Sequence, residues 1–188
     1  MVTSVLNHRQ HGFSLIEVMV TVFILAVGLL GIAGLQSRLQ VSEMESYQRA
    51  QALLLVNDMA NRLASNRNDV LSYKTASSLG AGMTCPTDVS SRQKIDAREW
   101  CLALQGAGES LGNSSVGALV GGRGCVAESP LGSGQFFITV AWQGLTPLSA
   151  PPASVTCGVN SYNGATGSAC VNDLCRRVVT TVVRIATL

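Results

Sequence analysis

The sequence predicts an α+β protein in which one long N-terminal helix packs on a small antiparallel β-sheet and disulfides link the loops. Three observations support this fold class. An apolar run extends from Val18 to Leu35, three strand-like runs lie in the second half of the chain, and all six cysteines follow the apolar run. The first half of the long helix is expected to span a membrane.

The apolar run follows the stretch Gly12-Phe13-Ser14-Leu15-Ile16-Glu17 and has Thr21 as its only polar side chain. A helix rises about 1.5 Å per residue, so residues 13–35 would cover about 30 Å, the thickness of one hydrocarbon core. Glu17 is unusual here because a carboxylate in an apolar helix costs roughly 2.5 kcal/mol at mid-membrane and less near an end. We expect a chain that carries such a group to use it.

This stretch resembles the type IV prepilin signal, which type IV pilins share with the pseudopilins of type II secretion. The resemblance implies that a prepilin peptidase cuts after Gly12 and that the new terminal residue, Phe13, is N-methylated. It also implies that Glu17 meets the N-terminal amine of a neighbouring subunit during assembly. The continuation over residues 23–36 is similar to minor pilins of the PilV type. The fold implied is pilin-like.

Two other interpretations of the N-terminus are open. A conventional secretory signal could end near Gly31-Ile32-Ala33, but such signals have an apolar core of roughly 7–15 residues, which is shorter than this run. A simple membrane anchor would explain the hydrophobicity and would leave Gly12, Phe13 and Glu17 without a role.

Composition argues against catalysis. Both histidines, His8 and His11, lie in the expected leader, so the processed chain would have no histidine. That excludes His-ligated zinc and the nucleophile pairs Ser-His and Cys-His. We therefore expect no enzyme activity, no cofactor and no metal site. The 13 Lys and Arg residues form no basic stripe with interleaved aromatics, so no nucleic acid is expected as a direct ligand.

The expected organisation has three parts. Residues 1–12 are a leader, residues 13–67 form the long helix, and residues 68–188 form a periplasmic globular α+β domain. Arg9 and the start amine favour a cytoplasmic leader. Beyond the apolar run the helix is expected to bury one face, made of Leu35, Leu39, Leu53, Val56, Ala60 and Leu63. Three glycines in the apolar run either permit close helix packing or reflect the frequency of glycine in membrane helices; they are Gly28, Gly31 and Gly34.

The second half of the chain predicts one more helix and a sheet. Ser91 is a candidate N-cap for a helix from about Arg92 to Gln105. Loops are expected over residues 70–82, 106–122 and 144–169. Strands are expected over residues 125–128, 135–143 and 177–185, in an antiparallel sheet of three or four strands with one face on the long helix.

The cysteines predict a disulfide framework of an exported domain, because their number is even and they lack CxxC spacing. We expect a local pair between Cys85 and Cys101 and a bridge from Cys157 to Cys170 or Cys175. These bridges would hold the loop over residues 144–169. The six candidates are Cys85, Cys101, Cys125, Cys157, Cys170 and Cys175.

The resemblance implies a minor pilin, a structural subunit of a tip or priming complex that starts type IV pilus assembly. Its partners would be other minor pilins, the major pilin and a tip adhesin, and the outputs would be adhesion and twitching motility. The subunit would wait in the inner membrane as a single-pass protein and would end at or near the pilus tip. The alternatives are a minor pseudopilin of a type II secretion system and a signal-cleaved periplasmic binding domain.

Overall fold

The computed structural model describes residues 12–186 except residues 109, 113, 116 and 118. Apart from Gly12, the expected leader lies outside the described residues. The chain divides into two units with a boundary between Ser42 and Glu43. Helix α1 (Leu15–Ser65) contributes to both units, and every other element belongs to the second.

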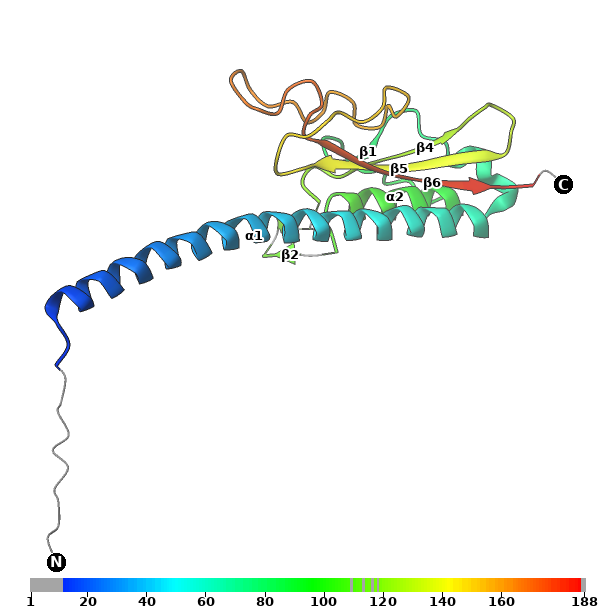
Figure 1. The fold of residues 1–188 in the computed structure, drawn as a ribbon. Coiled ribbons are helices and arrows are strands. Elements are labelled where there is room, and N and C mark those ends of the chain that lie inside the picture. Colours follow the sequence, from blue (N-terminus) through cyan, green and yellow to red (C-terminus); the bar gives the residue numbers. More distant parts are fainter. Residues whose placement is uncertain (1–11, 109, 113, 116, 118, 187–188) are drawn as a thin grey trace, which may run out of the picture. The chain divides into compact units, whose positions relative to one another are not determined.

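The second unit contains an antiparallel four-stranded sheet in the order β1-β4-β5-β6. Its strands are β1 (Leu79–Gly80), β4 (Arg123–Glu128), β5 (Gln135–Gln143) and β6 (Arg176–Arg184). The C-terminal turns of α1 and helix α2 (Arg92–Leu104) lie on one face of this sheet, and the segment between β5 and β6 lies on the other (Figure 1). The expected α+β fold, with its long helix on a small antiparallel sheet and its disulfide-linked loops, is confirmed.

Four short elements occupy segments that were expected to be loops. The 3₁₀ helix η1 (Arg67–Tyr73) follows α1, and β1 pairs with the start of β4. A two-stranded sheet forms between β2 (Ser110–Leu111) and β3 (Ser114–Ser115). The prediction of plain loops over residues 70–82 and 106–122 was therefore wrong, because strands of two residues are too short for alternation to show in the sequence.

The buried face of α1 differs from the expected one. Val56 and Leu63 are buried as expected, but Leu53 is 43 % exposed, and Leu35 and Leu39 are exposed as well. The buried side chains follow one another at helical spacing of three or four; they are Gln48, Ala52, Val56, Met59 and Leu63. A helix this rich in apolar residues offers more than one such stripe, and packing against the sheet selects one of them.

The core lies between this stripe, α2 and the inner face of the sheet. Phe136, Ile138 and Val140 of β5 are fully buried against α1 and α2. Trp100 of α2 is also fully buried, and its Nε1 donates to the carbonyl of Leu55 at 2.9 Å. A Cβ on Gly124 would lie 2.3 Å from the Trp100 ring, so β4 needs a glycine where the indole crosses it.

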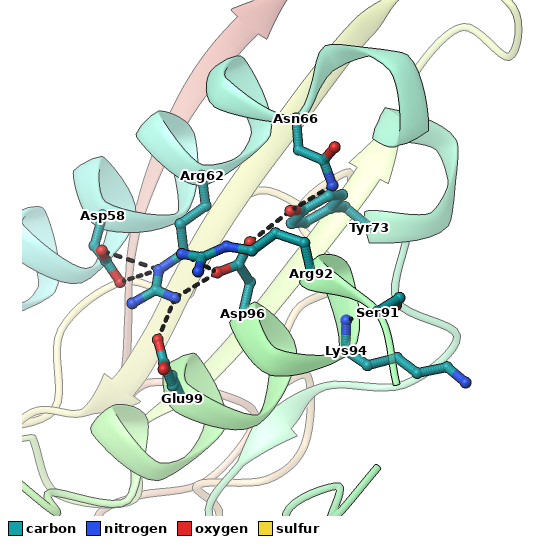
Figure 2. A network of polar contacts seen from close by, with 9 residues as sticks. All are labelled: Asp58, Arg62, Asn66, Tyr73, Ser91, Arg92, Lys94, Asp96 and Glu99. Carbon is teal, nitrogen blue, oxygen red and sulfur yellow. Dashed lines mark hydrogen bonds and ion pairs between the residues drawn. The ribbon is translucent and has the colours of Figure 1, made fainter. Parts of the chain in front are cut away.

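A buried carboxylate connects three helices (Figure 2). Asp96 of α2 is 1 % exposed and accepts hydrogen bonds from Tyr73 Oη at 2.6 Å and from Arg62 Nη1 at 2.7 Å. Arg92 Nη2 lies 3.0 Å from the same carboxylate. Because three donors surround Asp96, α1, η1 and α2 are held in one arrangement.

The same network perturbs two titratable groups. Burial and the hydrogen bond to Asp96 raise the pKa of Tyr73 to about 12. Burial alone would lower the pKa of Arg62, but its hydrogen bonds with Glu99, Asp58 and Asp96 raise that pKa above its usual value. Both groups therefore stay protonated at neutral pH, which is the form that donates to the carboxylates.

Three disulfides link the loops of the second unit. Cys85 pairs with Cys101, the local pair that the sequence favoured. The expected bridge from Cys157 to Cys170 or Cys175 is wrong, because Cys157 pairs with Cys125 of β4, and Cys170 pairs with Cys175. The reason is spatial: Cys157 packs with Ala141 on the outer face of the sheet, where Cys125 also lies.

Candidate functional site

The Gly12-Phe13 pair lies directly before the first turn of α1. The carbonyl of Ser14 accepts hydrogen bonds from the backbone N–H of Glu17 at 3.0 Å and of Val18 at 3.3 Å, which starts the helix. Gly12 is exposed, and a Cβ built on it would meet no described atom within 4 Å. Phe13 is 83 % exposed. The bond between Gly12 and Phe13 is thus accessible in the folded chain.

Glu17 lies in the first turn of α1. An acidic side chain is favourable there, because the unpaired N–H groups at a helix N-terminus carry a partial positive charge. Within the part of the chain that the structure describes, its carboxylate has no hydrogen bond and no ion pair. Glu17 is therefore free to pair with a group from another molecule.

The first part of α1 presents apolar side chains on all sides. Every residue from Phe13 to Met44 is exposed, and the first buried side chain is Gln48. By length and composition, α1 is the one helix among the described residues that is able to cross a membrane. Thr21 is the polar residue of the apolar run, and its Oγ1 donates to the carbonyl of Val18 at 2.9 Å. This hydroxyl therefore needs no hydrogen bond from water in an apolar environment.

The three glycines of this segment are not required by packing inside the chain. A Cβ on Gly28, Gly31 or Gly34 would meet no described atom within 4 Å. Each glycine costs about 1 kcal/mol of helix propensity relative to alanine, and contacts within the described chain do not offset that cost.

The remaining described residues can be compared with the requirements of a metal site and of a cysteine nucleophile. In the described ranges, no cluster of three or more His, Cys, Asp or Glu residues is placed to hold a metal ion. All six cysteines are in disulfides, so none of them is a free nucleophile. The candidate functional site therefore reduces to the N-terminal motif and the apolar helix that follows it.

A family model described as the prokaryotic N-terminal methylation motif matches residues 7–33. The motif is of the prepilin type. It supports a protein of the type IV pilin and pseudopilin superfamily, whose members are processed by a prepilin peptidase and have other pilins as partners. Searches of curated proteins and of solved structures gave no significant match. The apolar helix with this motif fits anchoring in the inner membrane before assembly.

The structure groups the predicted site residues in two places. Gly12, Phe13 and Glu17 lie together at the start of α1, and the six cysteines lie in the second unit. Two ion pairs that involve a buried carboxylate were not predicted from the sequence, Arg62 with Asp96 and Arg176 with Asp173. Only the i,i+3 spacing of Asp173 and Arg176 could have indicated one of them, and that spacing occurs often by chance.

Proposed function

We propose that this chain is a minor pilin of the PilV type, a structural subunit that helps to initiate type IV pilus assembly. The observation that carries the proposal is the prepilin-type motif at the start of a helix whose side chains from Leu15 to Met44 are all exposed. In this proposal residues 1–12 are the leader, residues 13–67 are the long helix, and residues 68–188 are the periplasmic domain.

The apolar part of α1 explains why the subunit would exist first in a membrane and then in an assembly. Burying apolar surface contributes about 25 cal/mol per Å², so this segment is stable only in a bilayer or against other apolar helices. Before assembly the inner membrane covers it, and the second unit lies in the periplasm, where its disulfides persist. During assembly, helices of other minor pilins and of the major pilin replace the lipid.

Cleavage of the leader would create one member of an ion pair that guides the helices as they replace the lipid. Cleavage after Gly12 would create a positive amine on Phe13, and N-methylation would keep it positive. The Glu17 carboxylate of one subunit would then meet the amine of a neighbour. An ion pair is far stronger in an apolar bundle than in water, so it favours one axial register of the helices. The finished subunit would lie at or near the tip beside the adhesin and would support adhesion and twitching motility.

A minor pseudopilin of a type II secretion system is the second candidate, since the motif and the helix support both assemblies. The six cysteines favour the pilus. A neighbouring gene cluster with other prepilins and a tip adhesin would support the pilus, and a secretion operon would support the rival. A signal-cleaved binding domain is the third candidate, and a mature N-terminus near Gly34 would identify it.

The decisive experiment replaces Gly12 with valine and measures intact mass and N-terminal sequence in the producing cell. We expect wild type to begin with N-methylated Phe13 and to have no free thiol. The Gly12→Val chain should remain as an uncut precursor in the inner membrane. Cleavage of this variant to normal mature protein would contradict the proposal.

A further inference from the structure

The two edges of the four-stranded sheet are covered to different extents. On the β4 side, β1 pairs with Arg123 and Gly124. Beyond β1, Thr75 N–H donates to the carbonyl of Val126 at 2.9 Å, and Thr75 Oγ1 accepts from Val126 N–H at 3.1 Å. The other edge is β6, nine residues that pair with β5 without a bulge.

The register shows which backbone groups of β6 are open. Ile185 N–H donates to Gly134, directly opposite it, at 2.9 Å, and Gly144 N–H donates to Cys175 at 2.8 Å. Because hydrogen-bonded pairs alternate in an antiparallel ladder, the odd-numbered residues of β6 bond to β5. The even-numbered residues direct N–H and C=O away from the sheet. Arg176 N–H donates to the carbonyl of Asp173 at 3.0 Å, but the N–H and C=O groups of the other four even-numbered residues have no partner within the described chain. They belong to Val178, Thr180, Val182 and Arg184.

The side chains of these residues lie on the outer face of the sheet. Thr180 Oγ1 is 2.9 Å from Thr139 Oγ1, Val182 is 46 % exposed, and the Arg184 guanidinium has no hydrogen bond or ion pair in the described part of the chain. A cavity of about 360 Å³ lies beside Thr180. Its walls include Cys125, Phe137, Thr139, Ser154, Cys157 and Thr180.

The charge of β6 argues against a second copy as the occupant of this edge. β6 contains Arg176, Arg177 and Arg184 and has no acidic residue. Arg176 and Arg177 already form ion pairs with Asp173 and Glu45, so Arg184 is the arginine of β6 that has no ion pair in the described chain. Pairing with β6 of another copy would give Arg184 no acidic neighbour in any register. A strand that carries an acidic residue fits this edge better.

We infer that the β6 edge binds an extended strand from a different protein subunit, by addition to the sheet. Eight open backbone groups supply main-chain hydrogen bonds, and alternate side chains supply specificity. The strand would place a large apolar side chain next to Thr180, at the cavity, and an acidic side chain next to Arg184. This inference rests on the proposed function at one point only, the source of the strand, which is another subunit of the same assembly.

The first test extends the full chain after Leu188 by a short Gly-Ser linker and a nine-residue strand with Glu beside Arg184 and Leu beside Thr180. A tethered strand has a high effective concentration, so even weak pairing is detectable. In detergent micelles, hydrogen exchange at the even-numbered amides of β6 should slow by about tenfold or more. The matched control chain has proline at each position of the added strand whose backbone N–H would donate to β6. Equal exchange in the two chains would overturn the inference.

The second test uses cells that lack their own copy of the protein. The chain with the filled edge should be cut after Gly12 as usual, and its amount in the purified assembly should fall about tenfold, since the partner strand has no edge left to bind. The proline control should assemble like wild type. Equal incorporation of the filled and control chains would refute a partner at this edge.

Two further outcomes separate the inference from the proposed function. Absence of the wild-type chain from every filament would refute the proposed function, and the exchange measurement would still decide whether the edge takes a strand. If the wild-type chain forms a dimer in micelles and the added strand abolishes it, the occupant of the edge is a second copy. That outcome would overturn the inference of a different subunit.

Discussion

Residues 15–44 of α1 and residues 45–65 of the same helix differ in what covers their apolar side chains. In the first part every side chain is exposed, including Phe23 and Leu30. In the second part a stripe that includes Val56 and Leu63 is buried against the sheet and α2. The second part therefore packs against other elements of the chain, whereas the apolar side chains of the first part need a membrane or another molecule to cover them.

A carboxylate in the first part of α1 and one that packs against the second part differ in the same way. Glu17 has no hydrogen bond or ion pair in the described residues, whereas Asp96, which packs against the second part of α1, accepts from Tyr73 and Arg62. A carboxylate with internal donors stabilises the fold. A carboxylate without them is available to a donor from another molecule.

The largest expected effect is on core packing. Leu63→Ala should lower the free energy of unfolding of the second unit by about 2–5 kcal/mol, because Leu63 is fully buried. Leu30→Ala, the same substitution at a side chain that is 73 % exposed, should change it by less than about 0.5 kcal/mol. Urea unfolding of the full chain in micelles, followed by tryptophan fluorescence, measures both. Equal losses would show that the two parts of α1 do not differ as described.

The next effect concerns the buried carboxylate. Asp96→Asn should cost about 2–3 kcal/mol, because it removes a buried charged acceptor that receives hydrogen bonds from Tyr73 and Arg62. Asp58→Asn removes another carboxylate that pairs with Arg62. Asp58 is 42 % exposed, so the expected cost is under about 1 kcal/mol. The same unfolding assay compares them, and a larger cost at Asp58 would count against the network.

A smaller effect depends on pH. The pKa of Tyr73 is about 12 in the folded chain and about 10 when unfolded, so the folded state holds this proton more tightly. This contribution to stability is complete below about pH 10 and is lost as the pH rises towards 12. Tyr73→Phe should cost about 1 kcal/mol at neutral pH and should reduce the fall in stability between pH 10 and 12.

Burial also raises the pKa of Tyr162, which adds to the fall in stability at high pH. Only the difference between Tyr73→Phe and wild type therefore reports on Tyr73. Tyr162→Phe is the matched control, because it removes a tyrosine from the outer face of the sheet. Identical pH profiles for wild type and Tyr73→Phe would contradict the assignment.

The smallest effect on folding is expected at Glu17. Glu17→Ala should leave the unfolding of the second unit, the cleavage after Gly12 and membrane insertion unchanged, because the carboxylate has no partner in the described chain. Its amount in sheared pili should fall, since the neighbouring amine would be left unpaired in an apolar bundle. Thr21→Val, one turn further along, is the control. Unchanged incorporation with normal piliation would refute an essential pairing role for Glu17.

Local patterns in the sequence predicted several elements closely. Strand β5 covers residues 135–143, as predicted from the β-branched and aromatic residues throughout this run. Helix α2 begins after Ser91, whose Oγ accepts from Lys94 N–H at 3.3 Å. The apolar helix and the N-terminal motif were evident for the same reason. In each case neighbouring residues carry the whole signal, so no distant contact is needed to recognise it.

Tertiary structure alone decided which distant segments meet. It paired Cys125 with Cys157, selected the stripe on α1 that excludes Leu53, and brought Asp96 between Arg62 and Tyr73. Each outcome depends on where the sheet, α2 and the segment after β5 lie in space. Sequence spacing does not encode those positions, because burial and pairing depend on distances between residues that are far apart along the chain.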